Sequence, residues 1–394
     1  MIRFVILWSI AGYPLIAGLT ALIGIDNGTV SIAFRALTAV CAGMLALALP
    51  KNRPDAPLVL FMLFWLAYLL RLLLNLHIYH EPLSRPVQDY WIWAIGACLL
   101  PALATLRSAN VRTATQLRMS LLLIVVVAIM LTMSQGSTAF VQATGEVTDI
   151  NRWNLGSLNP IATGHLGATG VLLGIGILVT GSRSRIESML ALGSVPTGLY
   201  LAILANSRGP IVALAVCVIT LVLASGRYGK AQFLVLVGIG LVACLAIFVP
   251  SASSILAGLT DRFDAIQSGN DLSAIGRTIS FQGAIDQFFG SPLFGDGIEE
   301  RVTGYYPHNL VLEAFMATGV IGGIPFTLFL FLSLRSSWKL FRIRSENTWV
   351  GLLAIQYIVA AQLSGSIYLS TAMWTIVSLS IVLSRQFKEY GHGV

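Results

Sequence analysis

Long apolar runs alternate with short polar turns from one end of the chain to the other. A helix that crosses a bilayer needs about 20 mostly apolar residues, and runs of about that length recur throughout the sequence. The charged residues gather mainly in the turns between these runs. The pattern predicts about twelve transmembrane helices, at residues 4–24, 29–49, 57–76, 90–106, 118–134, 161–180, 187–205, 210–225, 231–249, 309–334, 348–366 and 369–384.

Composition supports the same class of protein. Hydrophobic residues make up 56% of the chain and charged residues 10%, whereas soluble domains carry roughly 25% charged residues. A soluble enzyme, a disordered protein and a disulfide scaffold are therefore excluded. We predict an all-α polytopic membrane protein, with residues 1–394 forming a single transmembrane domain. Lys and Arg (24) exceed Asp and Glu (17), but they form short clusters between spans, so no nucleic-acid partner is expected.

The basic residues are distributed unevenly between the two sides of the predicted bundle. With the N-terminus inside, sixteen of the 24 Lys and Arg residues fall on one side. The positive-inside rule then places both termini in the cytoplasm. The outer side carries two longer loops, at about 135–160 and at 250–307; the second has 58 residues and helical stretches. Neither is large enough for an independent catalytic domain, so chemistry is expected from these loops together with the span ends.

The basic residues expected outside or within the spans are all arginines, because the four lysines lie on the cytoplasmic side. Arginine suits bidentate recognition of phosphate and stays charged in a partly dry site. Arg208 is the strongest candidate, because it lies in the short outer turn 206–210. Asn206 or Ser207 can cap the next helix and Pro210 suits its first turn, so backbone N–H groups and a guanidinium point to one anion site.

Two other candidate groups follow from position. Arg35 lies about two turns inside a span and is expected to face a polar cavity or partner. Arg71 and Arg85 are expected to be interfacial anchors or loop solubilisers. The pair Glu299–Glu300 is expected to be a solvated loop charge.

His308 lies where the long outer loop enters a span. The helix dipole and nearby arginines should lower its pKa, and a neutral imidazole can accept a proton as a general base. The alternative is a capping or interfacial histidine. His77 and His80 share a helical face but lack a third ligand, so no metal site is predicted and no cofactor is expected. His165 is expected to be a core residue.

Several short motifs occur in order over residues 190–330: Asn206-Ser207-Arg208-Gly209, Gly276-Arg277, Ser291-Pro292-Leu293-Phe294-Gly295-Asp296-Gly297, and His308-Asn309 followed by Gly319 and Gly322. In order and predicted sidedness they resemble the O-antigen ligase/polymerase superfamily. The resemblance implies a multi-span, GT-C-like membrane glycosyltransferase with a helical periplasmic loop. It also implies a glycan donor on undecaprenyl diphosphate and transfer at the periplasmic face of the bacterial inner membrane.

Within this resemblance we favour the ligase branch, which acts in lipopolysaccharide biosynthesis by moving O-antigen to lipid A–core. The repeat-unit polymerase is the alternative. We predict that Arg208, Arg277 and Arg301 bind the diphosphate, with Arg152 as a fourth candidate and Arg262 as a weaker one. His308 is predicted to deprotonate the acceptor hydroxyl in an inverting, metal-independent displacement. The partners expected are the lipid-linked donor, the lipid A–core acceptor and membrane lipid.

Two other classes of function are also compatible with twelve spans. A secondary transporter or flippase should show an internal repeat, and the late, unpaired long loop gives no such symmetry. A non-catalytic subunit of a glycan-export complex is the other possibility.

Overall fold

The computed structural model describes residues 1–48, 55–135, 158–225 and 272–389. Its first half consists of α1 (Ile2–Leu7), η1 (Trp8–Gly12), α2 (Tyr13–Ile23), α3 (Asn27–Ala48), α4 (Ala56–Leu73), η2 (Leu74–Ile78), α5 (Val87–Trp91), η3 (Ile92–Leu99), α6 (Leu100–Ser108) and α7 (Val111–Ser134). Its second half consists of α8 (Pro160–Thr180), α9 (Arg185–Leu204), α10 (Arg208–Ser225), α13 (Leu272–Gly290), α14 (Leu310–Arg342), α15 (Thr348–Ser364) and α16 (Thr371–Glu389).

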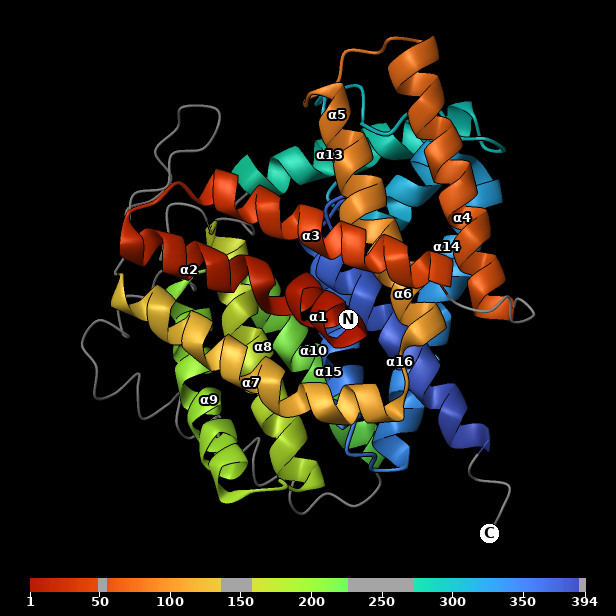
Figure 1. Ribbon diagram of the computed structural model, residues 1–394. Helices are drawn as coiled ribbons and strands as arrows, with labels where there is room; N and C mark the ends of the chain where they lie inside the picture. Colours follow the sequence, from red (N-terminus) through yellow and green to blue (C-terminus); the bar gives the residue numbers. More distant parts are fainter. Residues whose placement is uncertain (49–54, 136–157, 226–271, 390–394) are drawn as a thin grey trace.

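The predicted all-α membrane fold is confirmed (Figure 1). Eleven of the twelve predicted spans coincide with helices of the structure, and the span at 231–249 lies outside the described residues. Among the described helices, eight are long and apolar enough to cross a membrane, and α10 and α15 are shorter apolar helices. The predicted loop at 250–307 is described from residue 272 onward. There it forms α13, a turn and an isolated antiparallel bridge between Glu300 and Tyr305.

Three stretches of the first half, η1, η2 and η3, are π-helical. Pro14 and Pro101 each lack a backbone N–H, and their rings clash with the carbonyl four residues earlier. Those carbonyls belong to Ile10 and Ala97, which lie inside η1 and η3. The prolines therefore account for the wider turns in two of the three places.

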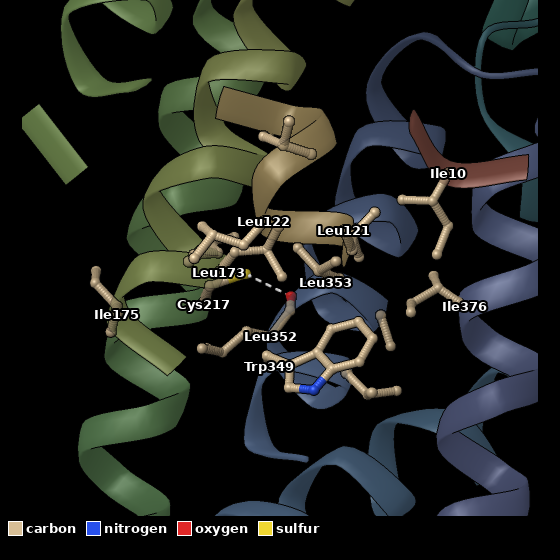
Figure 2. Close-up of a cluster of buried hydrophobic side chains, with 14 of the residues drawn as sticks. Ile10, Leu121, Leu122, Leu173, Ile175, Cys217, Trp349, Leu352, Leu353 and Ile376 are labelled. Atoms are coloured by element: carbon tan, nitrogen blue, oxygen red, sulfur yellow. Dashed lines mark hydrogen bonds between the residues drawn. The ribbon is translucent and has the colours of Figure 1, made fainter. Parts of the chain in front are cut away.

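The helices pack around two hydrophobic clusters. Figure 2 shows the first, where Leu121 and Leu122 of α7, Leu173 of α8 and Leu353 of α15 converge. The Cys217 thiol of α10 donates to the Leu352 carbonyl in the same cluster. The second cluster is rich in aromatic rings from α4, α14 and α16, with Trp374 contacting Phe61, Phe64, Trp65, Phe326 and Phe329. Helices α15 and α16 contribute residues to both clusters and so connect the two clusters.

Ion pairs bring several arginine-rich turns together at one end of the bundle, here called the basic end. Arg118 of α7 forms a bidentate pair with Glu187 of α9, with both N···O distances 2.8 Å, and both side chains are buried. The α8–α9 turn pairs with the α14–α15 turn through Arg183 and Glu346 at 2.5 Å. These contacts gather basic segments that the positive-inside rule assigns to one side.

The buried pair at the basic end should be costly to break. Arg118→Ala leaves the Glu187 carboxylate buried without its partner, and we expect a loss of about 3–5 kcal/mol in unfolding free energy. Arg183→Ala, in a pair whose side chains are each about half exposed, should cost about 0–1 kcal/mol. Both losses of unfolding free energy can be measured by unfolding the variants and the wild type in mixed micelles. Equal effects of the two substitutions would contradict this assignment.

Candidate active site

Helix α14 is broken at Gly319, where φ is 59° and ψ is −158°. This conformation is essentially restricted to glycine. The segment Ser291–Gly297, here called the motif loop, fills the break. The amide of Val320 donates to the Pro292 carbonyl at 2.8 Å, and the Asp296 amide donates to the Met316 carbonyl at 2.9 Å. A Cβ atom at Gly319 would lie 2.3 Å from the Leu293 carbonyl oxygen, so this position has no room for a side chain.

Arg71 of α4 completes this arrangement. Its guanidinium donates to the carbonyls of Ala317 (2.9 Å), Asp296 (3.0 Å), Phe294 (2.8 Å) and Gly295 (2.6 Å). The side chain is buried. The expectation of an interfacial anchor was therefore wrong, because Arg71 is held inside the bundle by one carbonyl of α14 and three of the motif loop, which one guanidinium can satisfy together.

The charges that follow the motif loop are also buried. Glu299 accepts hydrogen bonds from the amide and hydroxyl of Ser84 and from the Tyr90 hydroxyl. Glu300 accepts from the amides of Val302 and Thr303. Both residues are at most 5% exposed, so the expectation of solvated loop charges was wrong. Glu299 instead ties the loop to the segment before α5, and Glu300 stabilises the turn that leads to His308.

His308 lies directly before α14, and the local sequence explains why the helix begins there. The Asn309 side chain caps α14 by accepting from the Leu312 amide, and it donates to the Gln362 carbonyl near the end of α15. His308 itself adopts a positive φ of 57°, which is uncommon for a non-glycine residue and is concentrated at functional sites. The imidazole is thereby held at the junction of α14 and α15.

The environment of His308 favours its neutral form. Burial, and then the positive charge of Arg277, lower its pKa to about 4, against a smaller raising effect of a hydrogen bond with the Ser364 backbone. Nδ1 is buried and has no hydrogen-bond partner within the described residues. The rings of Tyr305 and Tyr306 lie beside it, with centroids 5.7 and 4.6 Å away. A neutral imidazole with an unused nitrogen can accept a proton.

Arg208 is the first residue of α10, two residues before the predicted span at 210–225, and Asn206 turns the chain with φ of 44°. This turn lies at the same end of the bundle as His308. A Cβ atom at Gly209 would lie 3.9 Å from Leu363, the neighbour of the Ser364 residue that bonds His308. The start of α10 thus lies against the end of α15 and against His165 of α8, whose Nε2 would be 3.8 Å from the same Cβ atom.

The predicted arginines do not all have the same surroundings. Arg277, on α13, is close enough to His308 for its charge to act on the imidazole. Arg301 is mostly exposed and forms ion pairs with Asp296 at 2.9 Å and Glu81 at 3.3 Å. Arg152 and Arg262 lie outside the described residues. The structure thus brings Arg277 and His308 together beside the Arg208 turn, and it places Arg301 on two carboxylates.

Sequence reasoning missed two groups at this site. The Arg85 guanidinium donates to the Tyr305 hydroxyl at 3.4 Å, and the Tyr305 ring lies beside that of Tyr306. Gln362 accepts from Asn309 through its carbonyl and from the Val311 amide through its side chain. The two tyrosines stand directly before His308 in the sequence and could have been recognised. Arg85, in the segment before α5, and Gln362, on α15, are far from His308 in the sequence and leave no local signal.

The fold and the site show a multi-pass helical membrane protein. Arginines and a neutral histidine lie at the end of the bundle opposite the basic end. Residues 194–327 match the family model described as O-antigen ligase. The matched range contains Arg208, Arg277, the motif loop and His308. The match confirms the resemblance drawn from the sequence and supports membership of the O-antigen ligase superfamily. No curated protein matches the chain.

The role of Arg71 can be tested by removing some or all of its hydrogen-bond donors. Arg71→Met keeps an apolar stem but leaves the carbonyls at the break without a donor, and we expect a loss of about 3 kcal/mol or more in unfolding free energy. Arg71→Lys should recover part of it, because an ammonium reaches fewer of the four carbonyls. Hydrogen exchange at the Val320 and Ile321 amides should quicken in the Met variant. Wild-type exchange and stability in that variant would contradict the role.

Proposed function

We propose that this protein is a glycosyltransferase that moves O-antigen polysaccharide from undecaprenyl diphosphate to lipid A–core at the periplasmic face of the inner membrane. The family match supports an O-antigen ligase or polymerase, and the ligase is the branch proposed here. The observation that carries the proposal is the placement of neutral His308 beside Arg277 and next to the turn of Arg208. Both termini are then cytoplasmic, and residues 1–394 act as one membrane domain.

The proposed reaction is a single displacement. The acceptor hydroxyl gives its proton to His308, its oxygen bonds to the anomeric carbon of the donor sugar, and the bond from that carbon to the diphosphate oxygen breaks. The configuration at the carbon inverts. Negative charge develops on the leaving diphosphate, and preorganised cationic donors stabilise it without reorganisation.

Arg208 and Arg277 are the diphosphate ligands that the geometry supports best. The helix N-terminus at Arg208 adds backbone donors to its guanidinium. Arg277 serves twice, because its charge binds the leaving group and adds to the effect of burial in keeping His308 neutral. Arg301 and Arg152 remain further candidates; Arg301 would have to exchange carboxylate partners for phosphate.

Transfer by the purified protein tests the proposal. With labelled lipid-linked glycan, lipid A–core and a metal chelator, the wild-type protein should extend lipid A–core. His308→Ala should lower the rate by about 10²–10⁴-fold, as loss of a general base does. His77→Ala is the matched control, since His77 is an exposed hydrogen-bond partner of Trp91.

Two results would count against parts of this scheme. Full transfer by a normally inserted His308→Ala protein would rule out His308 as the general base. Unchanged donor affinity in Arg208→Lys, which keeps the charge but loses the bidentate geometry, would remove that diphosphate contact. Extension of the lipid-linked repeat in place of lipid A–core would identify the polymerase.

The pH dependence offers a separate test. A general base must be deprotonated, so kcat/KM should be level from pH 8 to about 5 and fall through an acidic limb near the His308 pKa of about 4. Arg277→Gln removes a charge that lowers this pKa, so its limb should move to higher pH even though its rate is lower. Circular dichroism at each pH controls for unfolding. A limb near pH 6.5 in both proteins would contradict the assignment.

A further inference from the structure

A cavity of about 560 Å³ lies at the basic end, between the start of α4, the last turns of α14 and the end of α16. It shares no lining residue with the candidate active site, which lies at the opposite end of the bundle. Of the eleven described residues that line it, none is acidic and four are cations: Arg335, Lys339, Arg342 and Arg385. The cavity therefore has the charge of an anion-binding site.

Three of these cations lie on one face of α14. Arg335, Lys339 and Arg342 follow one another at spacings of four and three residues, which places them side by side on the helix. Like charges at these spacings repel each other. The negative end of the helix dipole favours cations in the last turn, but this effect does not extend to Arg335, two turns before the end. The helix alone therefore does not account for this concentration of charge.

The protein neutralises only part of this charge. Arg385 forms an ion pair with Asp55, the N-cap of α4, and Lys339 donates to the Ser384 carbonyl at 2.7 Å. In the part of the chain that the structure describes, no ion pair or hydrogen bond reaches the guanidinium groups of Arg335 and Arg342. Four cations and one carboxylate leave three positive charges at this place.

The apolar residues around the cavity indicate its level in the membrane. Leu328 and Phe331, which precede Arg335 on α14, are 45% and 59% exposed, as expected for side chains that face lipid. Trp338 lines the cavity and is 40% exposed, and tryptophan is enriched where the hydrocarbon layer meets the headgroups. Leu332 adds an apolar wall on the lipid side of the cations. The cavity therefore lies at headgroup level, with a lipid-facing surface directly beside it.

We propose that this cavity binds the headgroup of an anionic phospholipid, with the phosphate on Arg335 and Arg342 and the acyl chains along Leu328 and Phe331. Guanidinium groups give phosphate charge-assisted, bidentate hydrogen bonds, and basic pockets between membrane helices bind lipid headgroups in this way. A lipid fits better than a soluble anion, because the cationic face continues into the lipid-facing surface of α14. The site does not depend on the transferase reaction; in the proposed orientation it faces the cytoplasmic leaflet.

Binding of phosphatidylglycerol to the purified full chain tests the proposal. The lipid is titrated into phosphatidylcholine nanodiscs, and lipid retained on the protein is counted by native mass spectrometry. Arg335→Gln/Arg342→Gln should weaken binding at least about tenfold, since two charged phosphate contacts are lost. Arg112→Gln/Arg185→Gln is the matched control, because it removes the same charge from exposed positions of the basic end outside the cavity. The control should bind as wild type. Equal weakening by both pairs, or by neither, would overturn the site.

A second measurement places the lipid without any charge variant. Brominated phosphatidylglycerol should quench more tryptophan emission than the same mole fraction of brominated phosphatidylcholine, and Trp338→Phe should remove the difference. A difference that persists in Trp338→Phe would place the bound lipid elsewhere and contradict the proposal. Competition by millimolar inorganic phosphate would contradict the lipid assignment. Glycan transfer is a separate readout, so loss of transfer with intact lipid binding would bear on the proposed function alone.

Discussion

The break in α14 and its repair by the motif loop and Arg71 are the arrangement on which the candidate site depends. A helix interrupted inside a membrane protein leaves amides and carbonyls that lipid cannot satisfy, each at a cost of several kcal/mol. Here the carbonyls of Pro292 and Leu293 accept from the amides of Val320 and Ile321. Arg71 donates to the Ala317 carbonyl of α14 and to three carbonyls of the motif loop. The loop before His308 is thereby fixed to α14, and the imidazole is fixed with it.

That arrangement explains why several glycines and one arginine far from the chemistry belong to the site. Gly319 adopts a backbone conformation that other residues rarely adopt. At Gly295 the backbone packs so closely against Ala317 that a side chain would not fit. The buried carboxylates of Glu299 and Glu300 hold the following turn. His308 is thus positioned by backbone groups and by the buried carboxylates of the neighbouring turn.

The arginines in different parts of the molecule have different electrostatic surroundings and therefore different roles. At the basic end, Arg118 is paired with Glu187 and serves stability. At the opposite end, Arg277 acts on a histidine, and inside the bundle Arg35 is held between aromatic rings. Arg301, by contrast, is paired with the carboxylates of Asp296 and Glu81, which neutralise its charge. The difference follows from packing and not from residue type.

The sequence by itself determined which of the described segments form apolar helices, where the basic turns fall and that a helix begins near Pro210, because hydropathy, proline and capping act within a few residues. It also identified His308 as a candidate base. Only the tertiary structure decided that Arg71 is buried on the motif loop, that Glu299 and Glu300 are internal, and that cations of α14 and α16 share a cavity. Those contacts join residues far apart in the chain, and their energies arise only when the helices pack.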